Sequence, residues 1–259
     1  MPAYPILWKN VFELLLAAVR LRERSFQADA RAWVEALCPP LQVQGRQHIP
    51  ASGPALLTVN HYSRPDFQAW WIAFAISAVV PADVHWVMTA AWTFAGQPIA
   101  RPLTPLSRWL FQRIASVYHF TPMPPMPPAP SETEARAQAV RRVLDYARTT
   151  AQPLVGLSPE GQDVASGVLG WPPPGAGRFV SHLARLCHHI VPVGVYEDGD
   201  RLCLRFGAAY HLTLPPQLDA AERDRQASWV TMQAIARQLP PQLRGVFGAS
   251  PAKQQINGD

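Results

Sequence analysis

The feature that most constrains the fold is an alternation of short apolar runs with longer segments that have a helical pattern. The apolar runs, which are typical of buried strands, cover residues 55–60, 83–89, 153–158, 190–197 and 201–207. The helical patterns cover residues 65–80, 104–115, 131–150, 178–189 and 219–238. Strands that alternate with helices form a sheet covered by helices. The sequence therefore predicts an α/β fold with a mixed, partly parallel sheet flanked by helices.

Local signals predict where three of the helices begin. Pro65 and Asp66 are start signals for the helix over 65–80. The spacing of Ser131 and Glu134 is that of a capping box, which predicts a helix from 131 onward. Asp219 and Glu222 are expected to cap the last helix.

Other signals predict the connections between elements. We expect a short strand over 116–120, followed by an extended proline-rich loop over 121–130, because that segment can form neither a helix nor a central strand. Asp198-Gly199-Asp200 predicts a tight hairpin between the last two strands.

The first forty residues form a segment with its own pattern. Residues 5–37 are expected to be mostly helical and to stop at Pro39-Pro40. On a continuous helix the polar residues Lys9, Glu13, Arg20, Arg24 and Gln27 fall in one narrow sector. The wide apolar remainder suits packing on the domain or lying in a lipid interface. We therefore divide the chain into 1–40, a helical segment with a possible membrane contact, 41–240, the main domain, and 241–259, a tail expected to fray.

Composition limits the partners without selecting one. A net charge of +5 suits an anionic partner such as a phosphate-bearing molecule, a lipid headgroup layer or nucleic acid. The three cysteines have no CxxC spacing, so we expect a reducing compartment and neither a disulfide framework nor a metal site. The longest apolar stretches fall short of the roughly 20 residues that cross a bilayer.

The chemistry-bearing stretch is "LLTVNHYSRPD", residues 56–66. Its apolar run ends in Asn60 and His61, and Asp66 follows five residues after the histidine. One interpretation is a polar turn between a strand and a helix. The other is a general base with an orienting carboxylate one turn further on.

Three motifs together decide between these interpretations. "VNHYSRPD" resembles the first motif of the glycerolipid acyltransferase family, which is Asn-His followed by four residues and Asp. "LSPEGQD" at 157–163 is similar to the family's Phe-Pro-Glu-Gly-Thr-Arg motif, and "IVPVGVYE" is similar to its Val-Pro-Val strand. The resemblance covers roughly residues 40–215. It implies an O-acyltransferase that moves a fatty acyl group from acyl-CoA or acyl-carrier protein to a hydroxyl of a lyso-glycerolipid or a related lipid precursor.

The resemblance also implies roles for residues, partners and a place in the cell. His61 would be the base and Asp66 its orienting acid, while the substrate-binding residues would be Asn60, Arg64, Glu160 and Gly161. The resemblance implies an acyl donor and a lipid acceptor as partners, with no cofactor, no metal and no nucleic acid. The protein would be cytoplasmic and peripheral to the inner face of the membrane, with the N-terminal helix as its membrane contact.

The sequence departs from the family pattern where phosphate is bound. No residue aligns with the arginine that the family carries between these motifs, and Gln162 and Asp163 stand where Thr and Arg are expected. An aspartate repels a phosphate. A glycerol-phosphate acceptor is therefore not expected unless Arg64, Arg113 or Arg178 substitutes.

The residues that match have a chemical reason of their own. Acylation of a hydroxyl by a thioester needs a base, and histidine serves best near neutral pH, contributing about 10² to 10⁴-fold. Backbone N–H groups around Gly161, or at a helix start over 65–67, are candidate oxyanion donors. A serine hydrolase is disfavoured because Glu160 replaces the last glycine of G-x-S-x-G. The remaining alternative is a non-catalytic lipid-binding relative with the same fold.

The tryptophans are a second open question in the sequence. The question is where five of them lie in the fold: Trp70, Trp71, Trp86, Trp92 and Trp109. We expect them first in the core, and the alternatives are an acyl-chain tunnel or an interfacial belt.

Overall fold

A mixed sheet of seven strands forms the centre of the molecule. The computed structural model describes residues 2–92, 101–162 and 167–248. Within these residues the strand order is β1-β7-β6-β2-β5-β3-β4. The strands are β1 (Gln42–Gln44), β2 (Ala55–Val59), β3 (His85–Thr89), β4 (Thr121–Met123), β5 (Leu154–Leu157), β6 (His189–Asp198) and β7 (Arg201–Phe206). The β6–β7 pair is antiparallel and the other pairs are parallel, which confirms the predicted mixed, partly parallel sheet.

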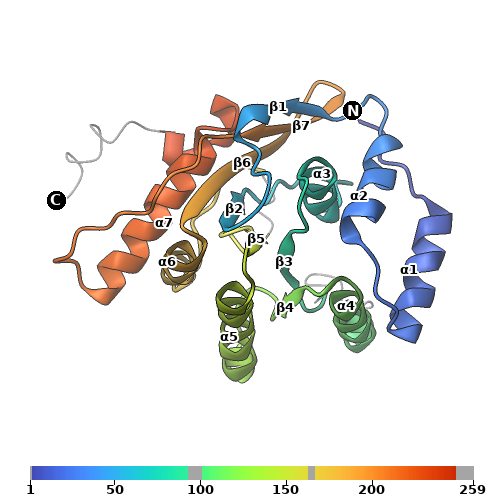
Figure 1. Cartoon of the computed structure of the whole chain (residues 1–259), viewed down its shortest axis with the longest axis horizontal. Coiled ribbons are helices and arrows are strands. Elements are labelled where there is room, and N and C mark those ends of the chain that lie inside the picture. Colours follow the sequence, from blue (N-terminus) through green and yellow to red (C-terminus); the bar gives the residue numbers. More distant parts are fainter. Residues whose placement is uncertain (1, 93–100, 163–166, 249–259) are drawn as a thin grey trace.

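Helices cover both faces of this sheet, with α1 to α4 on one side and α5 to α7 on the other (Figure 1). They are α1 (Trp8–Arg20), α2 (Phe26–Glu35), α3 (Trp70–Val79), α4 (Thr104–Tyr118), α5 (Thr133–Thr149), α6 (Ala176–Cys187) and α7 (Ala220–Ala236). The strand β2 shows why both faces need cover, since all five of its residues are buried. Leu56 packs with α5 and α6, whereas Leu57 packs in the core that contains Trp33 and Trp71. This alternation is the two-residue period of a strand.

Several predicted elements are confirmed. The strands expected over 55–60, 83–89, 153–158, 190–197 and 201–207 are present as β2, β3, β5, β6 and β7. The hairpin at 198–200 joins β6 to β7. Asp219 caps α7 by accepting from the backbone N–H of Glu222, and the Glu222 side chain accepts from the N–H of Asp219 in return.

Two helix starts differ from the prediction. No helix begins at Pro65, because Asp66 has a left-handed φ of 68° and α3 starts only at Trp70. The capping box at Ser131 does not form; Pro130–Glu132 is a 3-10 turn and α5 starts at Thr133 with no side-chain cap. Pro130 at the first position of that turn has the φ that a tight turn needs. Start signals of this kind suit a turn as well as a helix.

The strand expected over 116–120 is also wrong. Residues 116–118 are the last turn of α4, and the strand β4 lies one step later, at Thr121–Met123. This places Pro122 within a strand, although we expected an extended loop over 121–130. Proline is tolerated here because β4 is the last strand of the sheet and needs ladder hydrogen bonds on one side only.

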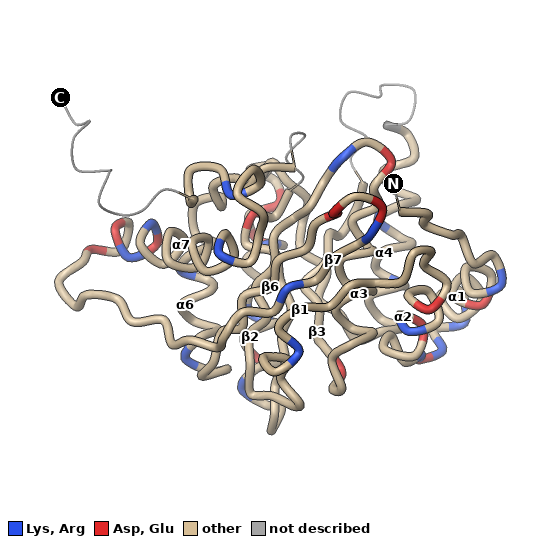
Figure 2. Tube along the Cα trace, turned by 90° about the horizontal axis from the view of Figure 1, so that it is seen from above, with Lys and Arg blue, Asp and Glu red and all other residues tan. Residues whose placement is uncertain are grey.

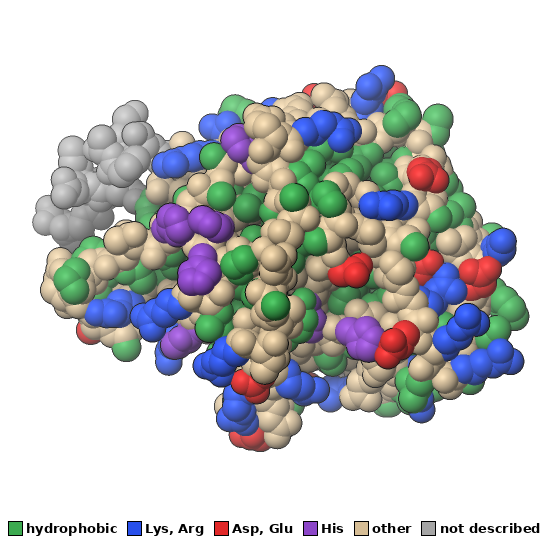
Figure 3. All heavy atoms as spheres, viewed as in Figure 1, with side chains coloured by type: hydrophobic (Ala, Val, Ile, Leu, Met, Phe, Trp, Pro, Cys, Tyr) green, Lys and Arg blue, Asp and Glu red, His purple; other side chains and the backbone are tan. Residues whose placement is uncertain are grey.

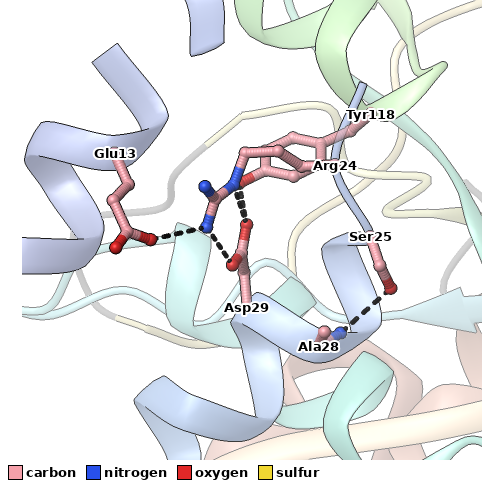
Figure 4. A network of polar contacts seen from close by, with 6 residues as sticks. All are labelled: Glu13, Arg24, Ser25, Ala28, Asp29 and Tyr118. Atoms are coloured by element: carbon pink, nitrogen blue, oxygen red, sulfur yellow. Dashed lines mark hydrogen bonds and ion pairs between the residues drawn. The ribbon is translucent and has the colours of Figure 1, made fainter. Parts of the chain in front are cut away.

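The N-terminal segment contains two helices and not one. Leu21 has a left-handed φ of 51°, the chain turns, and Ser25 caps α2 by accepting from the N–H of Ala28 at 3.2 Å. Arg24 therefore does not continue the polar face of α1. It turns back and donates to Asp29 of α2 at 2.6 and 2.8 Å and to Glu13 of α1 at 3.3 Å (Figure 4). Figure 2 shows basic and acidic residues close to one another around α1 and α2.

The boundaries at 40 and 240 stay predictions, but packing crosses both. Trp33 and Leu37 of the N-terminal segment belong to the main core, and so does Phe247 beyond residue 240. Residues 241–243 and 245–248 form two 3-10 turns. Residues 249–259, where the frayed tail is expected, lie outside the described residues.

Candidate active site

The first two motifs meet at one edge of the sheet. Asn60 and His61 directly follow β2, and the turn from Ser158 to Gly161 directly follows β5. Since β2 and β5 are neighbouring parallel strands with Thr58 opposite Leu157, both loops leave the same edge. Carboxyl ends of parallel strands are where ligands bind in open α/β sheets.

Glu160 joins these loops through backbone hydrogen bonds. Its side chain is buried, with only 2% of its surface exposed. One oxygen accepts from the backbone N–H of His61 at 2.6 Å, and the other accepts from the N–H of Gly170 at 2.8 Å. A buried carboxylate needs such donors to balance its desolvation. Glu160 therefore holds the backbone of His61 against the loop that contains Gly170; its predicted substrate contact stays a prediction.

Asn60 has a comparable bond pattern. Its amide nitrogen donates to the carbonyl of Val195 at 2.8 Å, and its amide oxygen accepts from the N–H of Val195 at 2.7 Å. The side chain thus imitates a strand partner for β6, in the strand that carries the third motif. This bidentate contact fixes the point from which the His61 loop leaves the sheet. The predicted role of Asn60 in binding substrate is not tested by it.

His61 and Asp66 differ in their exposure to solvent. His61 is partly buried, whereas Asp66 is exposed in the turn before α3. Among the described residues, no hydrogen bond or ion pair joins their two side chains. Asp66 does not lie in a first helical turn as expected, because α3 begins only at Trp70. The catalytic roles of the two residues stay predictions.

Arg64 is held by a carboxylate and not left open to solvent. Its Nε and Nη2 donate to the two oxygens of Glu197 at 2.6 and 2.8 Å. Tyr4 and Tyr62 donate to the same carboxylate at 2.5 and 3.3 Å. Burial on its own raises the pKa of the Glu197 carboxyl, but hydrogen bonds from Arg64 and Tyr4 outweigh it, so that pKa lies below its ordinary value. The Glu197 hydrogen bond in turn raises the pKa of Arg64.

Comparison with known proteins identifies the family at this point. The model of a family described as Acyltransferase matches residues 40–196, which is more than half of the chain and contains all three motifs. This chain belongs to the Acyltransferase family. The protein is accordingly an acyltransferase, and the resemblance seen in its motifs is confirmed.

Other comparisons add less. The similar solved structures include the 1-acyl-sn-glycerophosphate (LPA) acyltransferase PlsC from Thermotoga maritima, with 12% identity and a TM-score of 0.48 over 88% of this chain and 80% of that one. A comparison with curated proteins found no match.

The acyltransferase has site residues that the sequence did not reveal. Gly167 has a φ of 66°, and a Cβ there would lie 2.6 Å from the carbonyl oxygen of Ser63 in the His61 loop. Tyr4, Gly170 and Glu197 also contact the loops of the site. Glu197 ends the apolar run "IVPVGVYE", so a carboxylate at a strand end was its only signal. Partners so far apart in the sequence leave no local pattern.

One N–H from each group of candidate oxyanion donors is used inside a turn. The N–H of Gly161 donates to the Ser158 carbonyl at 3.2 Å, and the N–H of Phe67 donates to the Arg64 carbonyl at 3.1 Å. Gly161 itself has a φ of 67°, a conformation that glycine adopts without strain. The matched turn therefore needs Gly161 for its shape.

Of the three arginines that could substitute for the family's phosphate-binding arginine, Arg64 alone lies in the loop that carries His61. There its guanidinium donates to the Glu197 carboxylate. Arg113 lies on α4 over the ring of Trp109, with 5.6 Å from its Cζ to the ring centroid. Arg178 is exposed on α6.

The tryptophans divide into two groups. Trp71 and Trp86 are buried as expected. Trp70, Trp92 and Trp109 are each more than 40% exposed. Among the described residues, no group of three His, Cys, Asp or Glu side chains is placed to hold a metal ion.

Proposed function

We propose that this acyltransferase moves a fatty acyl group from a thioester donor, acyl-CoA or acyl-carrier protein, to a hydroxyl of a lyso-glycerolipid or related lipid precursor. The observation that carries the proposal is the contact between the first two motifs. The His61 backbone is held at 2.6 Å by Glu160, which lies 99 residues later in the chain. Such a support fixes the origin of the His61 side chain at the carboxyl edge of the sheet, where substrates reach it.

In the proposed reaction His61 is the general base. A ring nitrogen removes the proton of the acceptor hydroxyl as its oxygen bonds to the thioester carbonyl carbon. The tetrahedral intermediate collapses with cleavage of the C–S bond, and the leaving thiolate takes the proton back from the imidazolium. No covalent acyl-enzyme is needed. Asp66 would hold the second ring nitrogen. Among the described residues this hydrogen bond is not formed, and catalytic hydrogen bonds often tighten only when substrate binds.

The first experiment compares the wild type with His61→Ala. Transfer is measured from radiolabelled acyl-CoA, and separately from acyl-carrier protein, to glycerol-3-phosphate, lysophosphatidic acid, other lysolipids and alcohols without phosphate. We expect His61→Ala to lower the rate at least about 10²-fold with an unchanged melting temperature. The matched control is His48→Ala, which should leave the rate unchanged because His48 lies outside the three motifs, in a 3-10 turn before β2, whereas His61 follows β2. A wild-type rate in His61→Ala would refute the mechanism.

The same panel of acceptors tests the acceptor class. A phosphate monoester would have to compete with Glu197 for Arg64, and that pair is bidentate and mostly buried, with side chains 18% and 9% exposed. We therefore expect acceptors without a phosphate monoester to give the higher kcat/KM. Faster transfer to lysophosphatidic acid than to every other acceptor would contradict this.

A lipid surface is the proposed location of the reaction, at the inner face of the cytoplasmic membrane. The helix α1 exposes Trp8, Phe12, Leu15, Leu16 and Val19. These positions share one side of a helix, about 100° wide. The neighbouring helix α4 exposes Leu106 at 60%. Figure 3 shows hydrophobic side chains beside Lys and Arg at the end of the molecule that holds α1.

An exposed apolar face flanked by basic residues suits a helix that lies in the lipid interface. No described helix has both the length and the apolar character needed to cross a bilayer.

Sedimentation with liposomes that contain anionic lipid tests this location. We expect the double variant Trp8→Ser/Phe12→Ser to lose most binding, because these side chains are 73% and 68% exposed and contribute little to folding. The control is Val246→Ser, a residue that is 51% exposed outside α1. Undiminished binding of the double variant would refute α1 as the membrane contact.

A further inference from the structure

Four donor groups from two parts of the chain converge on the Glu197 carboxylate. Arg64 and Tyr62 lie in the loop that carries His61, and Tyr4 lies in the segment before α1. Glu197 itself lies near the end of β6. Its side chain is only 9% exposed, so each oxygen depends on these protein donors. We call these four residues, Tyr4, Tyr62, Arg64 and Glu197, the carboxylate clamp.

The clamp holds the loop at Arg64, between the two predicted catalytic residues His61 and Asp66. Arg64 stands three residues after His61 and two before Asp66. Glu160 and Asn60 fix the start of the loop, but neither reaches beyond His61. The remaining side-chain hydrogen bonds that hold this loop to the sheet, among the described residues, end on Glu197. The clamp therefore sets the path of the chain after His61.

Tyr4 adds ring contacts to its hydrogen bond. Its ring lies edge-on to Phe67, with centroids 5.5 Å apart, and beside Trp71 of α3 at 5.1 Å. The guanidinium of Arg64 lies over the same ring at 5.8 Å. Phe67 in turn packs against Tyr62 at 5.0 Å. Tyr4 thus contacts the loop and Glu197 of β6 together, so the N-terminal segment completes a support that the rest of the domain provides only in part.

We propose that Glu197 and Tyr4 are positioning residues for acyl transfer, which act through Arg64 and Tyr62 on the loop that carries His61 and Asp66. This inference rests on the proposed role of His61 as base. A base displaced by a fraction of an ångström loses much of its rate while substrate binding is retained. Loosening the clamp should therefore lower kcat and leave KM for the acyl donor almost unchanged.

The deciding variant is Tyr4→Phe, which removes one oxygen and keeps the ring contacts. We expect kcat to fall about 5- to 20-fold at constant donor KM. The matched control is Tyr118→Phe, which removes an equivalent hydrogen bond to a carboxylate, that from Tyr118 to Asp29 at 2.7 Å. The control should lower the melting temperature to a similar extent and leave kcat unchanged, because Asp29 lies outside the site.

Glu197→Gln supplies the second measurement. It removes the charge that Arg64 requires, so kcat should fall further than in Tyr4→Phe. The double variant Tyr4→Phe/Glu197→Gln should be no slower than Glu197→Gln alone, because both changes act on one clamp. Additive losses would contradict a single clamp. If Glu197→Gln does not fold, Tyr4→Phe beside Tyr118→Phe decides the question.

The outcomes separate this inference from the proposed function. Wild-type kcat in Tyr4→Phe and Glu197→Gln, with His61→Ala inactive, would overturn the clamp and leave His61 as the base. Wild-type turnover in His61→Ala would overturn the proposed mechanism. It would also overturn the clamp, because the clamp is proposed to position His61 as the base. Equal loss of kcat in Tyr4→Phe and Tyr118→Phe would show a general effect of stability and would also overturn the clamp.

Discussion

Gly167 shows how one missing side chain shapes the site. With a φ of 66° and the Ser63 carbonyl oxygen only 2.6 Å from a built Cβ, Gly167→Ala must push the His61 loop away. We predict about 10-fold lower kcat and a loss of roughly 2 kcal/mol in the free energy of unfolding. Enzyme kinetics and urea unfolding measure the two effects.

The control is Gly199→Ala. Gly199 has a φ of 60°, and nothing lies within 4 Å of a Cβ built there. This variant carries the same backbone strain, about 1 kcal/mol, without the clash. We expect unchanged kcat. Equal kcat values for Gly167→Ala and Gly199→Ala would show that the close approach of Gly167 to Ser63 does not affect catalysis.

His85 gives a prediction on pH. Burial lowers its pKa to about 4 from an ordinary 6.5, and its Nε2 lies 2.9 Å from the Thr121 hydroxyl. The unfolded chain therefore binds a proton at a higher pH than the folded chain does. The free energy of unfolding should fall as the pH drops from about 6.5 to about 4, by at most roughly 3 kcal/mol. Urea unfolding of His85→Gln should show a shallower fall over this window; the same slope in both proteins would contradict the prediction.

At the scale of residues, the sequence predicted which residues lie near the site better than it predicted the hydrogen bonds that they form. The proximity of His61 and Glu160 follows from two motifs that each end a strand, because neighbouring parallel strands share an edge. The pairing of Arg64 with Glu197 could not be predicted, since the two lie 133 residues apart and only tertiary packing unites them. For Asn60, the motif predicted a residue of the site at the end of β2. It did not predict that the side-chain amide would hydrogen-bond to the backbone of Val195 in β6.

At the scale of elements, the contact between α1 and α2 depends on Arg24. Its bidentate pair with Asp29 is mostly buried, with side chains 21% and 12% exposed. We predict that Arg24→Gln lowers the free energy of unfolding by about 1–3 kcal/mol and speeds hydrogen exchange in α1. Arg148→Gln is the control, because the Arg148–Asp145 pair is exposed and should contribute less than about 1 kcal/mol. Equal losses of unfolding free energy in Arg24→Gln and Arg148→Gln would show that Arg24 has no special part in holding α1 to α2.

Elements were predictable where several signals agreed. The helix α7 has a capping box and a long helical pattern, and it was placed within two residues at each end. The start of α3 was not, because Pro65 and Asp66 favour a turn and a helix equally and the left-handed φ of Asp66 decides for the turn. The break between α1 and α2 was hidden because Arg24 matched the polar face of a continuous helix by spacing alone.

At the scale of the whole molecule, the sequence suggested that residues 1–40 are a helical segment separate from the main domain. The structure places Trp33 of this segment in the main core, where its ring stacks on Phe74 at 5.4 Å and meets Trp71 at 5.8 Å. Removing a buried tryptophan alone costs about 3–5 kcal/mol, and whole domains are stable by only about 5–15 kcal/mol. A deletion of residues 1–37 would therefore remove much of the stability along with the proposed membrane contact.

We predict that the 1–37 deletion lacks cooperative thermal unfolding and has no transferase activity, even in detergent micelles that make a membrane contact unnecessary. By contrast, Trp8→Ser/Phe12→Ser should unfold near the wild-type temperature and remain active in micelles, because only its exposed face has changed. Circular dichroism and the micelle assay compare the two proteins directly. A deletion protein that unfolds cooperatively near the wild-type temperature would show that the chain from residue 38 onward folds without α1 and α2. Loss of activity without loss of folding would instead point to Tyr4, because Tyr4 is the residue of the deleted segment that donates to Glu197.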